Sequence, residues 1–351
     1  MWLYKGEDCC MRWDIAIDLG TQSVRVTDYR EGAALETAAR LAFREGKETP
    51  ICAGDIAARI EGKTCRGVEV VSPLKDGVLE NNFYADRLFR HLYRQADLGG
   101  AKRFGAMITC APFARPVQQE ALITAALDAG AQEAALVRSD AAAAVGAGLD
   151  FFAPEAKMLV DIGAGKITAT VFSGGRVAAF GYLPYGLSRI DERIQRIVRS
   201  GSGYRIGLAS AREIKHTLGT ALPEAAPMDI IMHMTGFNME TRLPGSFDVE
   251  TRPVLHACEE VVCEIAGLCL NLVTEIPDGL AADLNDAGVV LTGAGAEMAG
   301  MDKRIGDTLG IPCRIADSPA RCAARGLYAI MQSPEKYEAV MMDRSRKRTG
   351  R

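Results

Sequence analysis

One local pattern occurs twice in this chain and constrains its fold more than any other feature. Residues Lys157–Gly174 (KMLVDIGAGKITATVFSG) read as a buried strand ending at Asp161, a glycine turn, and a second strand with alternating apolar residues. Residues Trp13–Asp28 (WDIAIDLGTQSVRVTD) repeat this order around Asp18. Two hairpins of one design predict a duplicated chain whose halves face each other across a ligand.

Both turns carry groups that suit a nucleotide phosphate. Glycines allow backbone N–H groups to curl around a phosphate, and an Asp at a strand end reaches a bound metal, usually through water. The predicted phosphate contacts are Gly20, Thr21, Gln22 and Ser23 in the first turn and Gly163, Ala164, Gly165 and Lys166 in the second. A third turn (Gly293, Ala294, Gly295) separates a buried strand from a helix, where adenosine or phosphate passes close to the backbone. Together the three turns favour nucleotide binding.

Bulk composition places the chain among soluble two-domain proteins. With 351 residues it exceeds one ordinary core. Its net charge of −4 argues against nucleic acid as a partner, because proteins that bind nucleic acid usually carry a basic excess. No apolar run approaches the roughly 20 residues of a membrane span and no secretory signal is visible, so we expect a cytoplasmic protein. The ten cysteines form no C-x-x-C pair, which argues against a zinc site.

Predicted strands and helices alternate in both halves, which indicates an α/β layered fold. We expect two duplicated lobes, each with a mixed sheet flanked by helices, and two small inserted subdomains. The first lobe is assigned residues 13–32, 72–150 and 318–334 with an insert at 33–71, and the second 151–187 and 252–317 with an insert at 188–251. Residues 1–12 are expected to form a tail, and residues 335–351, which end in RSRKRTGR, a disordered basic tail with anionic lipid as one candidate partner.

Several longer motifs make the chain resemble a known family. They are DLGTQSV at Asp18, PLKDGVL at Pro73, AAAAVGAGL at Ala141, DIGAG at Asp161, REIKHTLGTALP at Arg212, VVLTGAGAEM at Val289 and GIPCRIADSPARCAARG at Gly310. Together they are similar to MreB, the bacterial actin-like cytoskeletal family, within the superfamily of actin, sugar kinases and seventy-kilodalton heat-shock chaperones. The resemblance runs from about Trp13 to Met331 and implies an actin-like fold.

The resemblance implies a function and assigns roles to residues. The family binds ATP with Mg²⁺, polymerises into paired protofilaments on the inner face of the membrane and guides lateral peptidoglycan synthesis. Its partners would be further copies of the chain, membrane proteins of cell-wall elongation and, peripherally, the membrane itself. The implied residues are Asp18 and Asp161 for catalysis and for Mg²⁺ through water, Glu213 and Lys215 beside the base, and Gly293, Gly295 and Ala296 around the adenosine.

The chain departs from the family pattern where the chemistry is performed. Ser139 stands where the family has the glutamate that orients the attacking water, and Asp140 is one residue further along. A shift of one residue at a helix start turns a side chain by about 100°, so Asp140 is a doubtful substitute. A family Gly-Gly-Asp segment here begins at Gly186, which keeps only its first glycine. Because phosphoryl transfer depends on positioning, we expect at most a slow ATPase.

Lys166 and Ile167 stand where the family has hydroxyl residues, and the effect of Lys166 has two readings. It could bind phosphate as the lysine of a P-loop does. It could instead fill the pocket and pair with Asp18 or Asp161. Either way, we expect nucleotide binding to be retained but weakened.

The residues that would insert into a membrane are also altered. The loop Ala96–Phe104 offers only Leu98 and Phe104 as large apolar side chains, which puts membrane contact in doubt. Two alternatives to a filament protein therefore remain open. One is a non-polymerising actin-like adaptor with little or no ATPase activity, and the other is a small-molecule kinase, for which no sugar-binding carboxylate cluster is visible.

Overall fold

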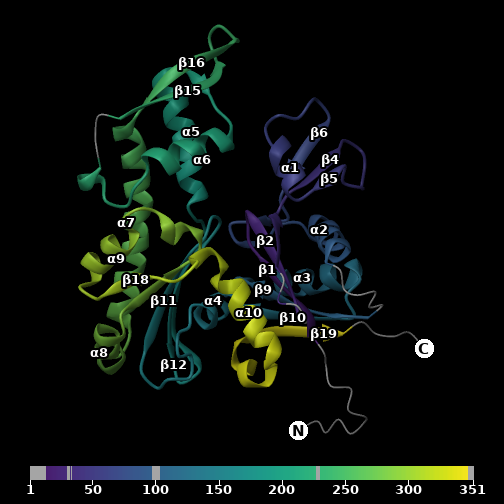
Figure 1. The fold of residues 1–351 in the computed structure, drawn as a ribbon, viewed down its shortest axis with the longest axis vertical. Helices are drawn as coiled ribbons and strands as arrows, with labels where there is room; N and C mark the ends of the chain where they lie inside the picture. Colours follow the sequence, from purple (N-terminus) through teal and green to yellow (C-terminus); the bar gives the residue numbers. More distant parts are fainter. Residues whose placement is uncertain (1–12, 30–31, 33, 97–102, 227–229, 347–351) are drawn as a thin grey trace.

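A computed structural model describes residues 13–29, 32, 34–96, 103–226 and 230–346. It has two lobes side by side, and each carries a smaller subdomain at the same end of the molecule (Figure 1). The expected tail at residues 1–12, Leu98, and the last basic residues 347–351 lie outside the described residues.

Lobe I is built on a six-stranded sheet in the order β19-β10-β9-β1-β2-β3. Its strands are β1 (Trp13–Leu19), β2 (Ser23–Asp28), β3 (Ala34–Ala38), β9 (Gly105–Cys110), β10 (Glu133–Arg138) and β19 (Met341–Arg346). Side chains of β1 alternate between its two faces, as the period of a strand requires. Ile15 and Ile17 pack under α2 (Asn82–Gln95) and α3 (Pro116–Ala129), whereas Ala16 belongs to the cluster between the lobes.

Lobe II repeats this sheet. Its order is β13-β12-β11-β17-β18, with β11 (Lys157–Ile162), β12 (Ile167–Ser173), β13 (Arg176–Leu183), β17 (Val289–Thr292) and β18 (Cys313–Ile315). In both lobes a strand ending in aspartate pairs antiparallel with the next strand and parallel with a distant one. The duplication predicted from the two hairpins is therefore confirmed by the topology of the sheets.

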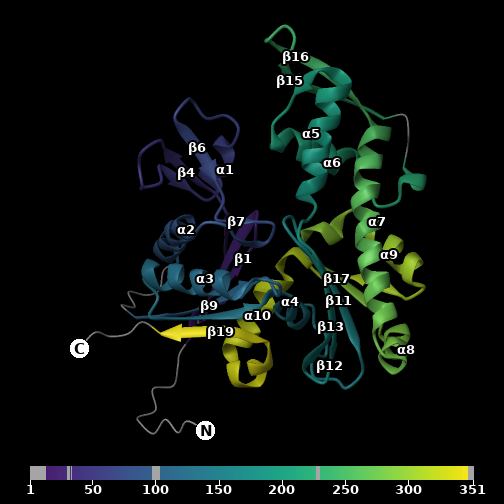
Figure 2. The same ribbon diagram turned by 180° about the vertical axis from the view of Figure 1, so that it is seen from behind.

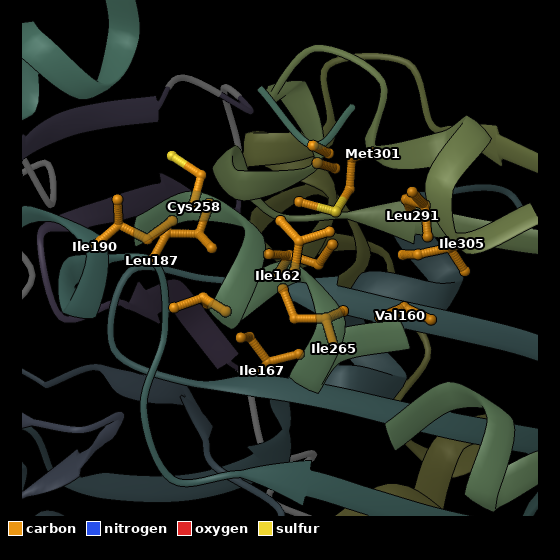
Figure 3. Packing of buried hydrophobic residues seen from close by; sticks show 14 of the residues in the cluster. Val160, Ile162, Ile167, Leu187, Ile190, Cys258, Ile265, Leu291, Met301 and Ile305 are labelled. Atoms are coloured by element: carbon orange, nitrogen blue, oxygen red, sulfur yellow. The ribbon is translucent and has the colours of Figure 1, made fainter. Parts of the chain in front are cut away.

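The outer face of the lobe II sheet carries the largest core cluster. It is covered by α7 (Thr251–Glu275), α9 (Met301–Leu309) and α5 (Ser188–Ser202). Figure 3 shows Val160 and Ile162 of β11 with Ile265 of α7 and Ile305 of α9 in this cluster. A further helix, α8 (Asp278–Ala287), was not predicted and supplies Leu284 to the same core.

Each lobe carries an insert with a small antiparallel sheet. The first contains β4 (Leu41–Arg44), β5 (Cys52–Ala53), α1 (Asp55–Ile60) and β6 (Val68–Val71), followed by the hairpin β7 (Leu74–Lys75) and β8 (Val78–Leu79). The second contains α5, β14 (Tyr204–Arg205), α6 (Leu208–Leu218), β15 (Ile231–Asn238) and β16 (Pro244–Glu250). The first insert was expected to begin at residue 33. The structure instead pairs β3 with β2 in the main sheet, so the separate small sheet begins at Leu41.

The expectation of a disordered tail from residue 335 is wrong for the part that the structure describes. Residues Met341–Arg346 form β19, which pairs antiparallel with β10 at the edge of the lobe I sheet (Figure 2). Val340 is buried just before this strand, and Arg346 Nε lies 2.9 Å from Glu133 Oε1. Arg344 and Arg346, two of the basic residues that suggested a solvated end, are exposed residues of this edge strand.

Two helices fill the space between the lobes. α4 (Ser139–Gly146) crosses α10 (Cys322–Gln332) so closely that neither Gly146 nor Gly326 has room for a side chain. A Cβ atom at Gly326 would lie 1.7 Å from the carbonyl oxygen of Ala142. The cluster around this crossing includes residues of both sheets, such as Leu159 of β11, and it therefore joins the two lobes into one body.

A candidate nucleotide site between the lobes

The tips of the two aspartate hairpins meet across the gap between the lobes. A Cβ atom at Gly165 would lie 2.2 Å from Thr21 Oγ1, and Gln22 Nε2 donates a hydrogen bond of 3.3 Å to Ser188 Oγ. A cavity of about 150 Å³ lies between the tips. It is lined by most of the residues predicted to contact phosphate: Gly20, Thr21, Gln22, Ser23, Gly163, Ala164, Gly165, Lys166, Gly293 and Ala294, together with Asp18 and Asp161.

The two turns close in the same way, which explains their shared sequence. The N–H of Gly20 donates to the carbonyl of Ser23 at 3.0 Å, and the N–H of Gly163 donates to the carbonyl of Lys166 at 2.9 Å. In the first turn a Cβ on the glycine would lie 2.7 Å from that carbonyl oxygen. Gly186 lies beneath the second turn, where a Cβ would lie 2.3 Å from the carbonyl oxygen of Gly163. It therefore supports the loop without lining the cavity.

Asp18 is held in place by two neighbours that the sequence did not reveal. Thr109 Oγ1, at the end of β9, donates to Asp18 Oδ1 at 3.1 Å, and Arg25 Nη1 lies 3.6 Å from Asp18 Oδ2. Burial raises the pKa of this carboxyl group, while Arg25 and Thr109 act in the opposite direction and Asp161 adds to the increase. Arg25 and Thr109 also line the cavity, because neighbouring strands bring their ends to one edge of the sheet.

Asp161 is paired with Lys166 from its own hairpin. Lys166 Nζ lies 2.9 Å from Asp161 Oδ2, and Thr292 Oγ1 lies 3.3 Å from Oδ1. Burial alone would lower the pKa of Lys166, but the negative charges of Asp161, Asp140 and Asp18 together raise it. The side chain of Lys166 is therefore a charged ammonium inside the cavity.

Asp140 and Ser139 occupy different environments at the start of α4. Asp140 is fully buried and does not line the cavity. Its carboxylate accepts hydrogen bonds from Arg138 and Thr170, with Arg138 Nη2 at 2.6 Å and Thr170 Oγ1 at 2.7 Å from Oδ2. Ser139 does line the cavity, and its buried Oγ has no hydrogen-bond partner among the described residues. This geometry argues against Asp140 as a substitute for the water-orienting glutamate, a role that the sequence already made doubtful, because its carboxylate does not line the cavity.

A second cavity of about 380 Å³ adjoins the first and shares Gln22, Gly163, Ala164 and Ala294 with it. Lys215 and Gly295 line it, as predicted for the adenosine site, and so do Arg212 and His216, which the sequence did not single out. Glu213 is exposed and is not among the lining residues, and Ala296 is buried in the core behind the turn.

Lys215 is engaged with a buried acid rather than free to meet a ligand. Its Nζ lies 2.6 Å from Asp191 Oδ1 and donates to the carbonyl of Leu187 at 3.2 Å. Arg212 Nε lies 3.4 Å from Asp191 Oδ2. The two basic residues together neutralise a fully buried carboxylate at the start of α5 and hold α6 beside the second cavity.

Membrane features are sparse in the described part of the chain. None of its helices combines the length and apolar character that crossing a bilayer requires. Phe104, one of two side chains considered for membrane insertion, is buried and makes an edge-to-face contact with Tyr93 at 4.9 Å between ring centroids. Phe104 is therefore a core residue of lobe I and not a candidate for membrane insertion.

Comparison with known proteins identifies the family. The sequence model described as MreB/Mbl protein matches residues 12–339. The chain belongs to the MreB/Mbl family. The cell shape-determining protein MreB of Escherichia coli (strain K12) is 31% identical over 319 residues, which cover 89% of this chain and 91% of that protein. The resemblance found in the motifs is thereby confirmed.

Solved structures show that the fold is actin-like. The crystal structure of MreB5 of Spiroplasma citri bound to AMPPNP superposes with a TM-score of 0.85 at 23% identity, covering 93% of this chain and 97% of that one. The MamK double helical filament matches with a TM-score of 0.77 at 19% identity, over 92% of this chain and 99% of that one. At these identities the superpositions establish the fold, and the predicted actin-like architecture is confirmed.

Proposed function

We propose that this MreB/Mbl family member binds ATP between its lobes and assembles into filaments that organise cell shape, with little or no ATP hydrolysis. The observation that carries the proposal is the apposition of two matching glycine turns, each beginning at an aspartate, across a cavity that continues into a larger one. Such turns present backbone N–H groups to phosphate oxygens, and the larger cavity suits an adenosine. The AMPPNP in the MreB5 structure supports the same assignment.

The low hydrolysis rate follows from the residues at the start of α4. Ser139 lines the cavity but carries no carboxylate to orient a water molecule, and the carboxylate of Asp140 is bound to Arg138 and Thr170 outside the cavity. Positioning of the attacking water contributes several orders of magnitude to phosphoryl transfer. We therefore expect bound ATP to remain unhydrolysed for much longer than filament assembly takes.

The residues present do not fit a magnesium ion. Mg²⁺ requires near-octahedral oxygen ligands at about 2.0–2.1 Å and usually keeps several waters. Asp161 is occupied by Lys166 and Thr292, and Asp18 by Thr109 and Arg25. The expected Asp–water–Mg²⁺ contacts therefore have no support in this geometry.

Self-association is supported by apolar side chains on the inserts. Ile51 and Ile56 of the first insert are 52% and 63% exposed, and Ile231 and Leu243 of the second are 55% and 62% exposed. Both inserts lie at one end of the molecule (Figure 1), where a further copy of the chain would cover these residues in a head-to-tail filament. The filament formed by MamK, which shares the fold, supports this reading.

The cellular role proposed here extends that of the Escherichia coli relative, a cell shape-determining protein. The filaments would lie in the cytoplasm at the inner face of the cell membrane and guide lateral peptidoglycan synthesis through membrane proteins of wall elongation. The alternative is a non-polymerising actin-like adaptor that binds the same partners as a monomer.

Electron microscopy and sedimentation of the purified chain with and without ATP test the proposal. We expect pelletable filaments with ATP and phosphate release close to background. Ile231→Lys should abolish pelleting, whereas Val117→Lys, at an exposed apolar position on α3 away from the inserts, should leave it unchanged. A chain that binds ATP but stays monomeric at all concentrations tested would support the adaptor instead. Rapid phosphate release would refute the hydrolysis argument.

A further inference from the structure

Each of the two site aspartates lies near a basic side chain. Arg25 Nη1 lies 3.6 Å from Asp18 Oδ2, and Lys166 Nζ lies 2.9 Å from Asp161 Oδ2. Both basic residues line the phosphate cavity and are largely buried, with side chains 11% and 15% exposed. The negative charge of Asp161 is therefore neutralised by Lys166, whereas that of Asp18 is only partly offset, because Arg25 also pairs with Glu36 at 2.7 Å.

The position of Lys166 is fixed by the chain around it. Its aliphatic stem lies against Gly77 in the β7–β8 hairpin of lobe I, where a Cβ atom would be 2.8 Å from Lys166 Cδ. Gly77 has φ +77°, a conformation that favours glycine, so the backbone can lie directly on the stem. A lysine from lobe II thus lies under a hairpin from lobe I, with its ammonium in the cavity.

We propose that Lys166 takes the place of the divalent cation, so that this chain binds ATP or ADP without magnesium. An ammonium group has three N–H donors, and Asp161 accepts from one of them. The others can donate to phosphate oxygens, as a P-loop lysine does. This inference rests on the proposed nucleotide site.

A divalent ion would gain little in this cavity. To reach Asp161 through water it would have to displace the ammonium of Lys166, and the buried stem leaves that ammonium close to its present position. Two cations would then lie side by side at a partly buried site, where repulsion is weakly screened. Lys166 therefore gives the nucleotide phosphates a positive charge that belongs to the protein, in place of a metal ion that exchanges with solvent.

Calorimetric titration of ATP into the full chain, in Mg²⁺ buffer and in EDTA, tests the inference. For the unmodified chain we expect dissociation constants that agree within about threefold. Lys166→Met keeps the stem and removes the charge, so binding in EDTA should weaken by about tenfold to a hundredfold, and Mg²⁺ should restore part of it. Lys75→Met, on the β7–β8 hairpin that covers the Lys166 stem but with a 67% exposed side chain, should leave both values unchanged.

Each outcome decides between named possibilities. If the unmodified chain binds ATP but loses tenfold or more in EDTA, the inference is overturned and the nucleotide site stands. If Lys166→Met binds more tightly in both buffers, the lysine obstructs the site and the inference is again overturned. If the unmodified chain binds ATP in neither buffer, both the inference and the proposed function are overturned. The comparison of buffers for the unmodified chain is decisive even if the variant does not fold.

Discussion

Replacing Arg138 by methionine should destabilise the protein strongly, because it leaves a buried carboxylate without its counter-charge. Asp140 is fully buried, and the Arg138 side chain is 19% exposed. Arg138 Nη2 lies 2.6 Å from Asp140 Oδ2, and Arg138 Nε lies 3.1 Å from Asp140 Oδ1. Breaking a buried pair by removing one partner costs about 3–5 kcal/mol, which is a large share of the roughly 5–15 kcal/mol that holds a typical domain folded.

The structure also suggests that this variant should loosen the two lobes. Arg138 and Asp140 belong to lobe I, whereas Thr170, which donates to the same carboxylate, belongs to β12 of lobe II. The guanidinium of Arg138 also lies 5.1 Å from the ring centroid of Phe180 on β13. Removing Arg138 therefore weakens contacts on both sides of the gap between the lobes.

Urea unfolding followed by circular dichroism measures the effect. The double variant Arg138→Met with Asp140→Leu removes both charges, so it should recover about 2 kcal/mol or more of the loss seen in Arg138→Met alone. Arg176→Met, at an exposed position on β13, should change the free energy of unfolding by less than about 0.5 kcal/mol. Equal losses in the single and double variants, or a single-variant loss below about 1 kcal/mol, would refute the reasoning.

Three further predictions concern the fold. Gly326→Ala places a Cβ 1.7 Å from a backbone oxygen of α4 and should cost about 2 kcal/mol or more in urea unfolding, whereas Gly267→Ala, which meets nothing within 4 Å, should be neutral or stabilising. Burial, and to a lesser extent Arg94, lowers the pKa of His91, so the unfolded chain binds a proton that the folded chain excludes. Stability should therefore fall as the pH drops from about 7 to 5, and His91→Gln should flatten that slope in unfolding curves; an unchanged slope would contradict the assignment. Deleting residues 341–351 removes β19 and exposes the β10 edge, so the truncated chain should unfold at lower urea concentration and aggregate; an unchanged midpoint would mean that the strand contributes nothing to stability.

The hairpins could be predicted because their signals are local. Each buried strand alternates or runs apolar up to its aspartate, and each glycine turn closes through its own backbone, as the bonds from Gly20 and Gly163 show. The repeated pattern therefore identified both the duplication and the place where the lobes meet. Family motifs then identified the actin-like arrangement, which local patterns alone leave open.

Features that depend on distant partners were not predictable in the same way. The strand Met341–Arg346 has a basic, exposed pattern and becomes ordered only by pairing with β10. On α6, the sequence pointed to Glu213 and Lys215. Lys215 does line the second cavity, but Arg212 and His216 line it in place of Glu213. Because successive side chains on a helix are turned by about 100° from each other, an error of one position is enough to move a residue off the face that lines a site.

The partner of Lys166 illustrates the same limit. From the sequence, this lysine could bind phosphate or pair with Asp18 or Asp161, because no local pattern distinguishes these partners. The structure pairs it with Asp161, places Gly77 over its stem and leaves its ammonium in the cavity. The structure thus shows the pairing with Asp161, and phosphate binding by the same ammonium is the proposal made above.

A crystal structure of the chain grown with AMPPNP tests most directly whether the two hairpins grip a nucleotide. The account predicts phosphates between Thr21 and Gly165, with Lys166 Nζ within hydrogen-bonding distance of a phosphate oxygen and the adenine in the cavity beside Lys215. Nucleotide bound elsewhere on the protein, or an empty cavity at saturating AMPPNP, would contradict it.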